Sequence, residues 1–128
     1  KALYEAATAA EKSGDNEAII AAYKKLEKNK QYANEAIYKQ AMASMQLNRI
    51  DEAQALAKRA GGMTGPYAVQ SMILYADTFF KKGEIKRAKT IYIEMRRRLS
   101  GDTKGVVTRK IVACNKALKL PENDGIEN

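Results

Sequence analysis

The sequence predicts an all-α fold built from antiparallel helical hairpins, and three observations support this prediction. Small residues recur every 35 positions in two series, Ala6, Ala41 and Ala76, and Ala18, Ala53 and Ala88, with Ala22, Ala57 and Tyr92 one turn beyond the second series. Residues that favour a break between helices recur at the same spacing, at Ser13, Asn48 and Gly83. No segment shows the sustained alternation of apolar and polar residues that is typical of a strand. A repeat of this length indicates stacked hairpins, in which small residues let paired helices approach closely.

The first four helices are predicted at residues 1–12, 16–29, 33–47 and 50–60. The run Ser13-Gly14-Asp15 separates the first two, because glycine adopts left-handed backbone and Ser or Asp supplies a cap oxygen. Asn48 is suited to the same kind of break before the fourth helix, and Gly61-Gly62 marks its end.

The last three helices are predicted at residues 66–82, 84–99 and 103–118. Pro66 suits the first turn of a helix, and Gly83 separates the next two. The run Ser100-Gly101-Asp102 precedes the seventh helix. The last residues begin with Pro121 and are mostly polar, so residues 120–128 are predicted to be a flexible tail.

The length of 128 residues allows one domain or one array of small repeats. We expect a solenoid over residues 1–119, with repeats at about 1–30, 33–65 and 68–100 and a terminal helix at about 103–118. No run of 18 apolar residues and no signal-peptide pattern is found, so a membrane span and a targeting segment are not expected in this sequence. The compartment is not readable from the sequence, and membership of a larger chain or assembly stays an open alternative.

The residues that most catalytic sites require are scarce in this chain. It has no histidine, which removes imidazole-based nucleophilic catalysis and the common zinc motifs. Its single cysteine, Cys114, shares a helical face with Ile111 and Leu118 and is predicted to be buried. Asp51, Glu52 and Asp102 fall at predicted helix starts, where the helix dipole favours negative charge. We therefore predict no enzymatic activity, no catalytic residues, no metal site and no cofactor.

The positive charge of the chain is concentrated toward its carboxyl end. The net charge is +8, and residues 81–119 carry 13 Lys and Arg against three acidic side chains. Candidate members of a basic patch are Lys82, Lys86, Arg96, Arg97, Arg98 and Arg109. These charges either solvate exposed helix faces or form a surface for nucleic acid or an acidic protein. Nucleic acid is disfavoured, because only Tyr92 offers an aromatic ring among the basic residues.

Two segments are similar to the second-helix half of the tetratricopeptide repeat, namely Asn48 to Ala60 (NRIDEAQALAKRA) and Gly83 to Tyr92 (GEIKRAKTIY). The resemblance implies a right-handed superhelix of three repeats and a terminal helix. It also implies that the first helices of the hairpins line a concave face, which in such proteins binds a peptide or helix of a partner protein.

The residues expected on this concave face are mostly apolar: Tyr38, Met42, Met45, Ile73, Asp77, Phe80 and Val112. They predict a groove for an amphipathic helix or an apolar peptide, in which methionines supply adaptable contacts. Two alternatives stay open, namely that the stripe belongs to the core or that native sequence outside this chain fills the groove. The predicted function is a non-catalytic protein-interaction scaffold. The alternative is a basic accessory domain that binds nucleic acid or an acidic protein through residues 81–119.

Overall fold

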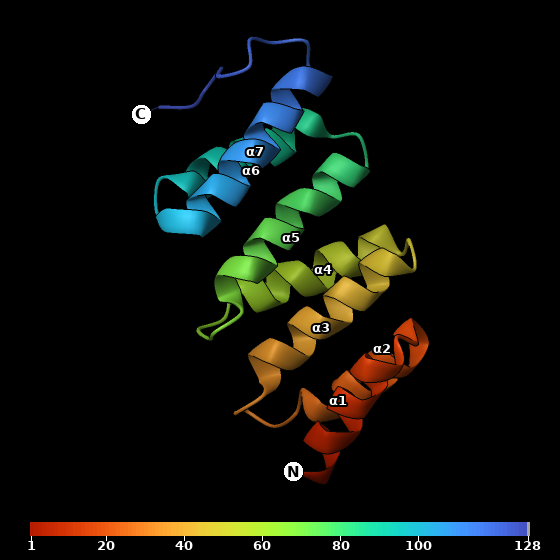
Figure 1. Cartoon of the computed structure of the whole chain (residues 1–128). Helices are drawn as coiled ribbons and strands as arrows, with labels where there is room; N and C mark the ends of the chain where they lie inside the picture. Colours follow the sequence, from red (N-terminus) through yellow and green to blue (C-terminus); the bar gives the residue numbers. More distant parts are fainter. Residues whose placement is uncertain (128) are drawn as a thin grey trace. The chain divides into compact units, whose positions relative to one another are not determined.

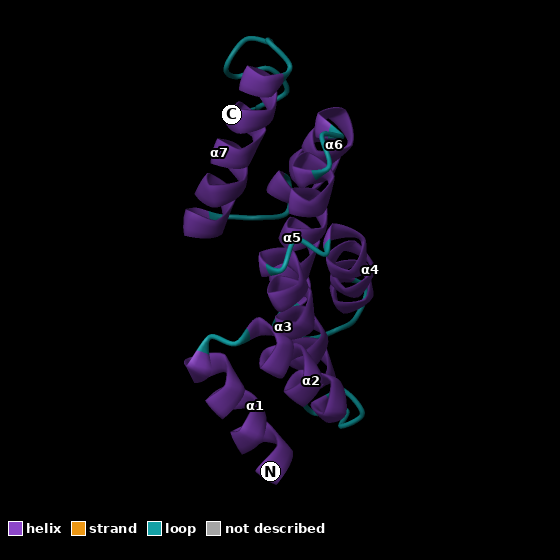
Figure 2. Ribbon diagram, turned by 90° about the vertical axis from the view of Figure 1, so that its right-hand side faces the viewer, coloured by secondary structure: helices purple, strands orange, loops and turns teal. Residues whose placement is uncertain are grey.

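The computed structural model describes residues 1–127, which form seven helices and no strand (Figure 2). In chain order these are α1 (Ala2–Ser13), α2 (Asn16–Leu26), α3 (Ala33–Gln46), α4 (Ile50–Gly61), α5 (Ala68–Lys81), α6 (Ile85–Arg96) and α7 (Gly101–Ala117) (Figure 1). The predicted all-α fold of helical hairpins is therefore confirmed.

The chain divides into two compact units, and the division falls inside α5. The first unit covers Lys1–Tyr75 and the second begins at Ala76. Within the first unit α1 packs against α2, α2 against α3, and α3 against α4. Within the second unit α6 packs against α7. The contact between α2 and α3 joins the first two hairpins into one packed body.

The same tight turn closes the first helix of each hairpin. Gly14, Asn48 and Gly83 all have left-handed backbone, with φ of 75°, 60° and 84°. At Asn48 the turn is closed by the amide of Arg49, which donates to the carbonyl of Ser44 at 2.9 Å. Glycine and asparagine tolerate this conformation better than other residues do, so sequence and backbone agree at all three positions.

The predicted register of the first repeat is wrong by one residue. Ala7 is fully buried where α1 packs, whereas Ala6 is exposed. Three other positions shift in the same direction: Gly14 takes the place assigned to Ser13, Ile19 that of Ala18, and Tyr23 that of Ala22. The first interval is therefore 34 residues and the second 35. The error arose because Ala6 and Ala7 are adjacent small residues that fit the alanine series equally well.

Several helix ends differ from the prediction, and local hydrogen bonds explain two of them. α2 ends at Leu26 rather than at 29, because the Asn29 side chain accepts from the amide of Gln31 and forms a separate turn. α5 begins at Ala68 rather than at 66, because the amide of Tyr67 donates to the side chain of Asn34. α6 ends three residues earlier than predicted, and α7 begins two residues earlier.

Asn34 fixes the connection between α4 and α5. Its buried side chain donates to the carbonyl of Ala60 at 2.9 Å and accepts from the amide of Tyr67 at 2.6 Å. Gly65 lies against it so closely that an added Cβ would be 2.5 Å from the Asn34 Oδ1 atom. This connection is therefore held by one side chain and depends on a glycine opposite it.

Alanine is the residue that recurs most often among the buried apolar positions of the first unit, and it also occurs at buried positions of the second. One core cluster of the first unit consists of Ala7, Ile19, Tyr23, Leu26, Ala36 and Ala43. In the second unit the buried apolar residues include Phe79, Ala88, Tyr92, Val107, Ile111 and Cys114, so the prediction that Cys114 is buried is confirmed. Burial raises the pKa of the Cys114 thiol above its ordinary value. The cores combine a few large side chains with alanines at close helix contacts.

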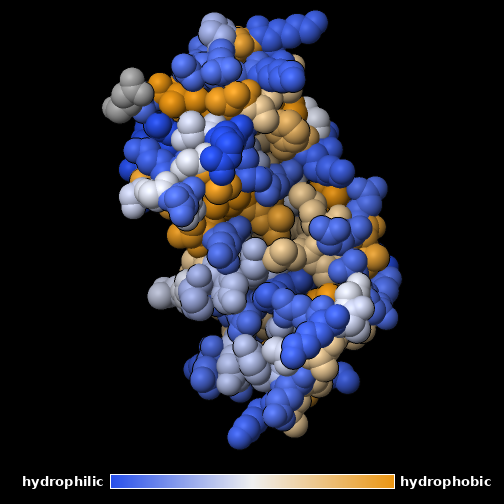
Figure 3. All heavy atoms as spheres, viewed as in Figure 1, coloured by the Kyte–Doolittle hydropathy of each residue, from blue (hydrophilic) through white to orange (hydrophobic). Residues whose placement is uncertain are grey.

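Large apolar side chains are also exposed at separate points of the surface, namely at Leu3, Met42, Val69, Val106 and Leu120. Figure 3 shows apolar patches between hydrophilic residues on one face of the chain. Scattered apolar residues are normal on a protein surface, so only those beside a pocket suggest a site. None of the helices within residues 1–127 has the length and apolar character required to cross a membrane.

The corrected register predicts that the same substitution destabilises the chain at one of two neighbouring alanines and not at the other. Ala7→Leu should destabilise the chain by about 1–3 kcal/mol, because the larger side chain forces packed helices apart. Ala6→Leu should change the free energy of unfolding little, since residue 6 is exposed. Urea denaturation of both variants measures the difference. Equal stability of the two variants would contradict the observed packing of α1.

Candidate functional site

A cluster of three polar side chains joins the first hairpin to α3. Glu11 on α1 accepts a hydrogen bond from the Tyr23 hydroxyl on α2 at 2.7 Å. Its other carboxylate oxygen lies 2.5 Å from the Lys39 Nζ atom on α3. The Lys39 ammonium also lies 5.8 Å from the centre of the Tyr67 ring, within the range of a cation–π contact. One carboxylate thus links three helices of the first unit.

Each group of the cluster has one well-defined protonation state at neutral pH. The hydrogen bond from Lys39 lowers the pKa of Glu11, against an opposing effect of burial. Burial and the hydrogen bond to Glu11 raise the pKa of Tyr23. Burial acts to lower the pKa of Lys39, but its contacts with Glu11 outweigh this and raise it. The carboxylate is therefore ionised while the phenol and the ammonium stay protonated, which suits a structural cross-link better than proton transfer.

The second unit contains a cluster of the same three groups. The Tyr92 hydroxyl on α6 donates to Asp77 on α5, and Lys110 Nζ on α7 lies 3.0 Å from the same carboxylate oxygen. Burial, followed by the bond to Asp77, raises the pKa of Tyr92. Tyr23 and Tyr92 occupy the same repeat position in the corrected register, and Ala57 holds that position in the intervening hairpin.

A shallow pocket of about 110 Å³ opens beside the first cluster. It is lined by Glu11, Asn16, Ile19, Lys39, Met42, Ala43 and Gln46. Met42 is 40% exposed, although its neighbours Ala41 and Ala43 on α3 are buried. The apolar part of the lining comes from Ile19, Met42 and Ala43, and the side-chain amides of Asn16 and Gln46 also belong to it. The pocket can accept a small apolar side chain of a partner. The amides of Asn16 and Gln46 are then available to the main chain of that partner.

The predicted groove residues of the first unit have different environments. Tyr38 is half-buried and stacks on Tyr67, with ring centres 5.1 Å apart and an angle of 24° between the planes. Met45 and Ile73 are half-buried, and only Met42 is exposed. Tyr38 therefore supports the α4–α5 connection, and Met42 is the residue of this set that is most available to a partner.

In the second unit the remaining groove residues are Asp77, Phe80 and Val112, all half-buried. Asp77 is held by Tyr92 and Lys110, as described above. Val112 lines a depression of about 220 Å³ together with Lys116, Leu120 and Glu122. Asp77 therefore contributes to the packing of this unit, whereas Val112 lies at its surface.

Five of the six predicted basic residues are exposed, and three of the six also contact a group of the chain and form an engaged group: Lys82, Arg96 and Arg97. Lys86, Arg98 and Arg109 are exposed. Lys82 lies 3.9 Å from Glu84, and Arg97 lies 3.7 Å from Glu94.

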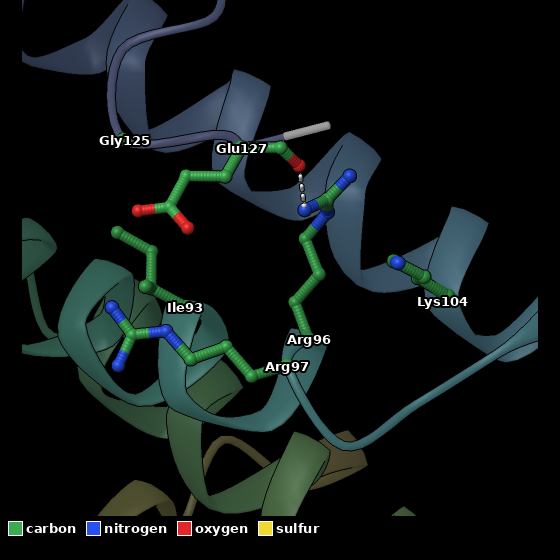
Figure 4. Close-up of a pocket in the computed structure, with 6 residues that line it drawn as sticks. All are labelled: Ile93, Arg96, Arg97, Lys104, Gly125 and Glu127. Carbon is green, nitrogen blue, oxygen red and sulfur yellow. Dashed lines mark hydrogen bonds between the residues drawn. The ribbon is translucent and has the colours of Figure 1, made fainter.

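Arg96 belongs to the engaged group and makes two hydrogen bonds. It donates to the Thr108 hydroxyl at 2.7 Å. It also donates to the main-chain oxygen of Glu127 at 2.6 Å, as Figure 4 shows. Part of the positive charge of residues 81–119 is thus already matched within the chain.

The carboxyl-terminal segment, which was predicted to be a flexible tail, makes hydrogen bonds with two helices of the second unit. Residues 121–127 fold back onto α6 and α7, where Asn115, Lys89 and Arg96 each bond to them. The prediction rested on the low apolar content of the segment, but its contacts are made by main-chain oxygens and one carboxylate. Sequence reasoning did not predict the contacts of Asn115 and Lys89 with this segment, because no spacing rule relates these residues to it.

Sequence reasoning also missed the roles of Glu11 and Tyr23. A signal was present, since one interval of 34 residues followed by one of 35 aligns Tyr23 with Tyr92, and both tyrosines have a carboxylate on the preceding helix. Among residues 1–127, no group of three or more His, Cys, Asp or Glu side chains is placed to hold a metal ion.

Removing the Lys39 charge should reveal a pH-dependent contribution of Glu11 to stability. Because the pKa of Glu11 is lowered from 4.5, its stabilising effect is present above that value and is lost as pH falls through the lowered one. Lys39→Met should therefore reduce the free energy of unfolding at about pH 7, and this deficit should shrink at about pH 3. Urea denaturation at both pH values measures it, with exposed Lys58→Met as control. A deficit of equal size at both values would contradict the role assigned to the ion pair.

Comparison with models of protein families and with curated proteins gives no match for this chain. The arrangement of its side chains is therefore the basis for a proposal about function.

Proposed function

We propose that the chain is a non-catalytic, tetratricopeptide-like module that binds a segment of a partner protein beside Met42. The exposed methionine that lines the first-unit pocket is the observation that carries the proposal. A thioether side chain adapts to different apolar partners, and its burial would contribute about 25 cal/mol for each Å² removed from water.

The tetratricopeptide assignment is supported by recurring features rather than by one motif. The left-handed turns at Gly14, Asn48 and Gly83 and the buried alanines at positions 7, 41 and 76 follow intervals of 34 and 35 residues. Such intervals are typical of this repeat class, in which the first helix of each hairpin contributes to the binding face. Met42 lies on α3, the first helix of the second hairpin.

The polar residues of the lining suggest how a bound segment would be oriented. Glu11 and Lys39 neutralise each other, so the pocket has no strong charge preference. The amides of Asn16 and Gln46 can donate to or accept from a peptide main chain. We therefore favour a partner segment that inserts one apolar side chain and presents its backbone to these amides.

The proposal does not include catalysis. The chain has no histidine, and the ionisable groups around the pocket are paired with one another. Binding of nucleic acid has less support than binding of protein, because the one aromatic ring among the basic residues, Tyr92, is buried and cannot stack on a base.

Met42→Glu should abolish partner binding and leave folding unchanged. The side chain is 40% exposed, so a carboxylate there remains hydrated in the free chain but would lose water on docking. A photo-reactive residue at position 42 first identifies the bound segment by cross-linking and mass spectrometry. Isothermal titration with the synthetic segment then compares the variants.

The matched control is Lys24→Glu on the exposed surface of α2, which should bind as the unchanged chain does. Melting curves by circular dichroism show whether the variants are folded. A large fall in the melting temperature of Met42→Glu would place Met42 in the core and overturn the proposed site. So would unchanged affinity for the cross-linked segment.

A further inference from the structure

The segment from Pro121 to Glu127 makes specific contacts with α6 and α7, although it is almost entirely polar. The central contact comes from Asn115 on α7, whose side chain is fully buried. Its amide nitrogen donates to the main-chain oxygens of Glu122 at 2.8 Å and Asp124 at 3.0 Å. A buried amide that holds two successive turns of a peptide main chain recognises the shape of that peptide rather than only its charge.

A second contact recognises a carboxylate. Lys89 Nζ on α6 lies 2.6 Å from the Asp124 Oδ2 atom, and the Lys89 side chain is only 11% exposed. An ammonium group that has lost most of its water needs an opposite charge or several acceptors nearby. The short distance is typical of a charge-assisted hydrogen bond, so this position favours an acidic side chain.

A third contact selects glycine next to the carboxylate. Gly125 has a φ of 79°, a conformation that side-chain-bearing residues rarely adopt. An added Cβ would also be 2.9 Å from Ile93 Cδ1 and 3.3 Å from Lys89 Cε. The surface therefore fits an aspartate followed by a glycine in a tight turn.

Basic side chains extend the surface beyond this turn. A pocket of about 170 Å³ remains beside the segment and is lined by Ile93, Arg96, Arg97, Lys104, Gly125 and Glu127 (Figure 4). Arg96 donates to the main-chain oxygen of Glu127 there. Further acidic residues after the Asp-Gly turn would lie among three cationic side chains.

We propose that this α6–α7 surface is a docking site for an acidic peptide of a partner protein that contains an Asp-Gly turn, and that residues 121–127 occupy it as an intramolecular competitor. The site is independent of the Met42 pocket, which belongs to the first unit. Charge complementarity and the seated segment itself define the chemistry of the partner.

The contacts favour a peptide over nucleic acid. Asn115 donates to two peptide carbonyls in a fixed geometry, and the Gly125 position requires a backbone without a side chain. A polyanion that is recognised by charge alone would use neither feature. Since a short tether gives an effective concentration in the millimolar range, the attached segment hides the surface from partners of moderate affinity.

The test uses the full chain with the segment released. Gly125→Val should displace it through strain and overlap with Ile93, and Asp124→Lys should displace it through repulsion from Lys89. The probe is a fluorescently labelled peptide with the sequence of residues 119–127 (KLPENDGIE), and fluorescence anisotropy reports its binding. Both variants should bind the probe at least about tenfold more tightly than the unchanged chain does, because the competitor is removed.

Charge reversal at Lys89 then tests specificity. Lys89→Glu added to Gly125→Val should abolish binding, whereas Lys86→Glu, an exposed lysine on the same helix, should preserve it. A probe carrying lysine at the position of Asp124 should restore binding to the Lys89→Glu chain, which a merely unfolded variant would not do. A probe with valine at the glycine position should not bind the released chain.

Three results would overturn the proposal. These are equal affinity of the unchanged and released chains for the probe, binding that is insensitive to Lys89→Glu, and full competition by single-stranded DNA at physiological salt. The last result would indicate a general polyanion surface. Circular dichroism of each variant accompanies the titrations.

Discussion

Two helices can approach closely only where neither presents a bulky side chain, and this constraint determines the packing of the chain. Ala7, Ala41, Ala76 and Ala88 are all fully buried. Each removes little apolar area from water, so these contacts alone contribute modest stability. The large buried residues, such as Tyr23 and Tyr92, therefore contribute most of the buried apolar area per residue. Their hydroxyl groups need hydrogen-bond partners inside the packed units.

The polar clusters follow from this requirement. Each buried tyrosine places its hydroxyl against a carboxylate on the first helix of its hairpin, and a lysine from a later helix neutralises that carboxylate. The clusters thus satisfy the polar end of a large core residue and connect neighbouring helices in one step. Where alanine replaces the tyrosine, at position 57, no hydroxyl requires such a partner. In the repeats described here, the carboxylate–lysine link between helices thus accompanies a buried tyrosine.

The sequence was sufficient to predict the all-α fold, the number of helices and most breaks between them, because those features depend on local residue types. It did not fix the register of the first repeat, since adjacent alanines at positions 6 and 7 are equivalent in pattern and differ only in burial. Nor did it relate Lys39 to Glu11 or Lys110 to Asp77, because these contacts join residues 28 and 33 positions apart. The exposure of Met42 among buried neighbours likewise depends on how α3 is rotated in its unit.

The burial of Cys114 has a consequence for how the second unit can be observed. It is the only thiol in the chain, and like Tyr92, Val107 and Ile111 it is buried in the second unit. This burial raises the pKa of the thiol. The thiolate is the reactive form, so modification by a disulfide reagent requires that this part of the protein first open to water. The rate of labelling then equals the rate constant of the exposed thiol multiplied by the fraction of time the unit is open. Without any engineered probe, the chain therefore carries a native reporter for local unfolding of its carboxyl-terminal half.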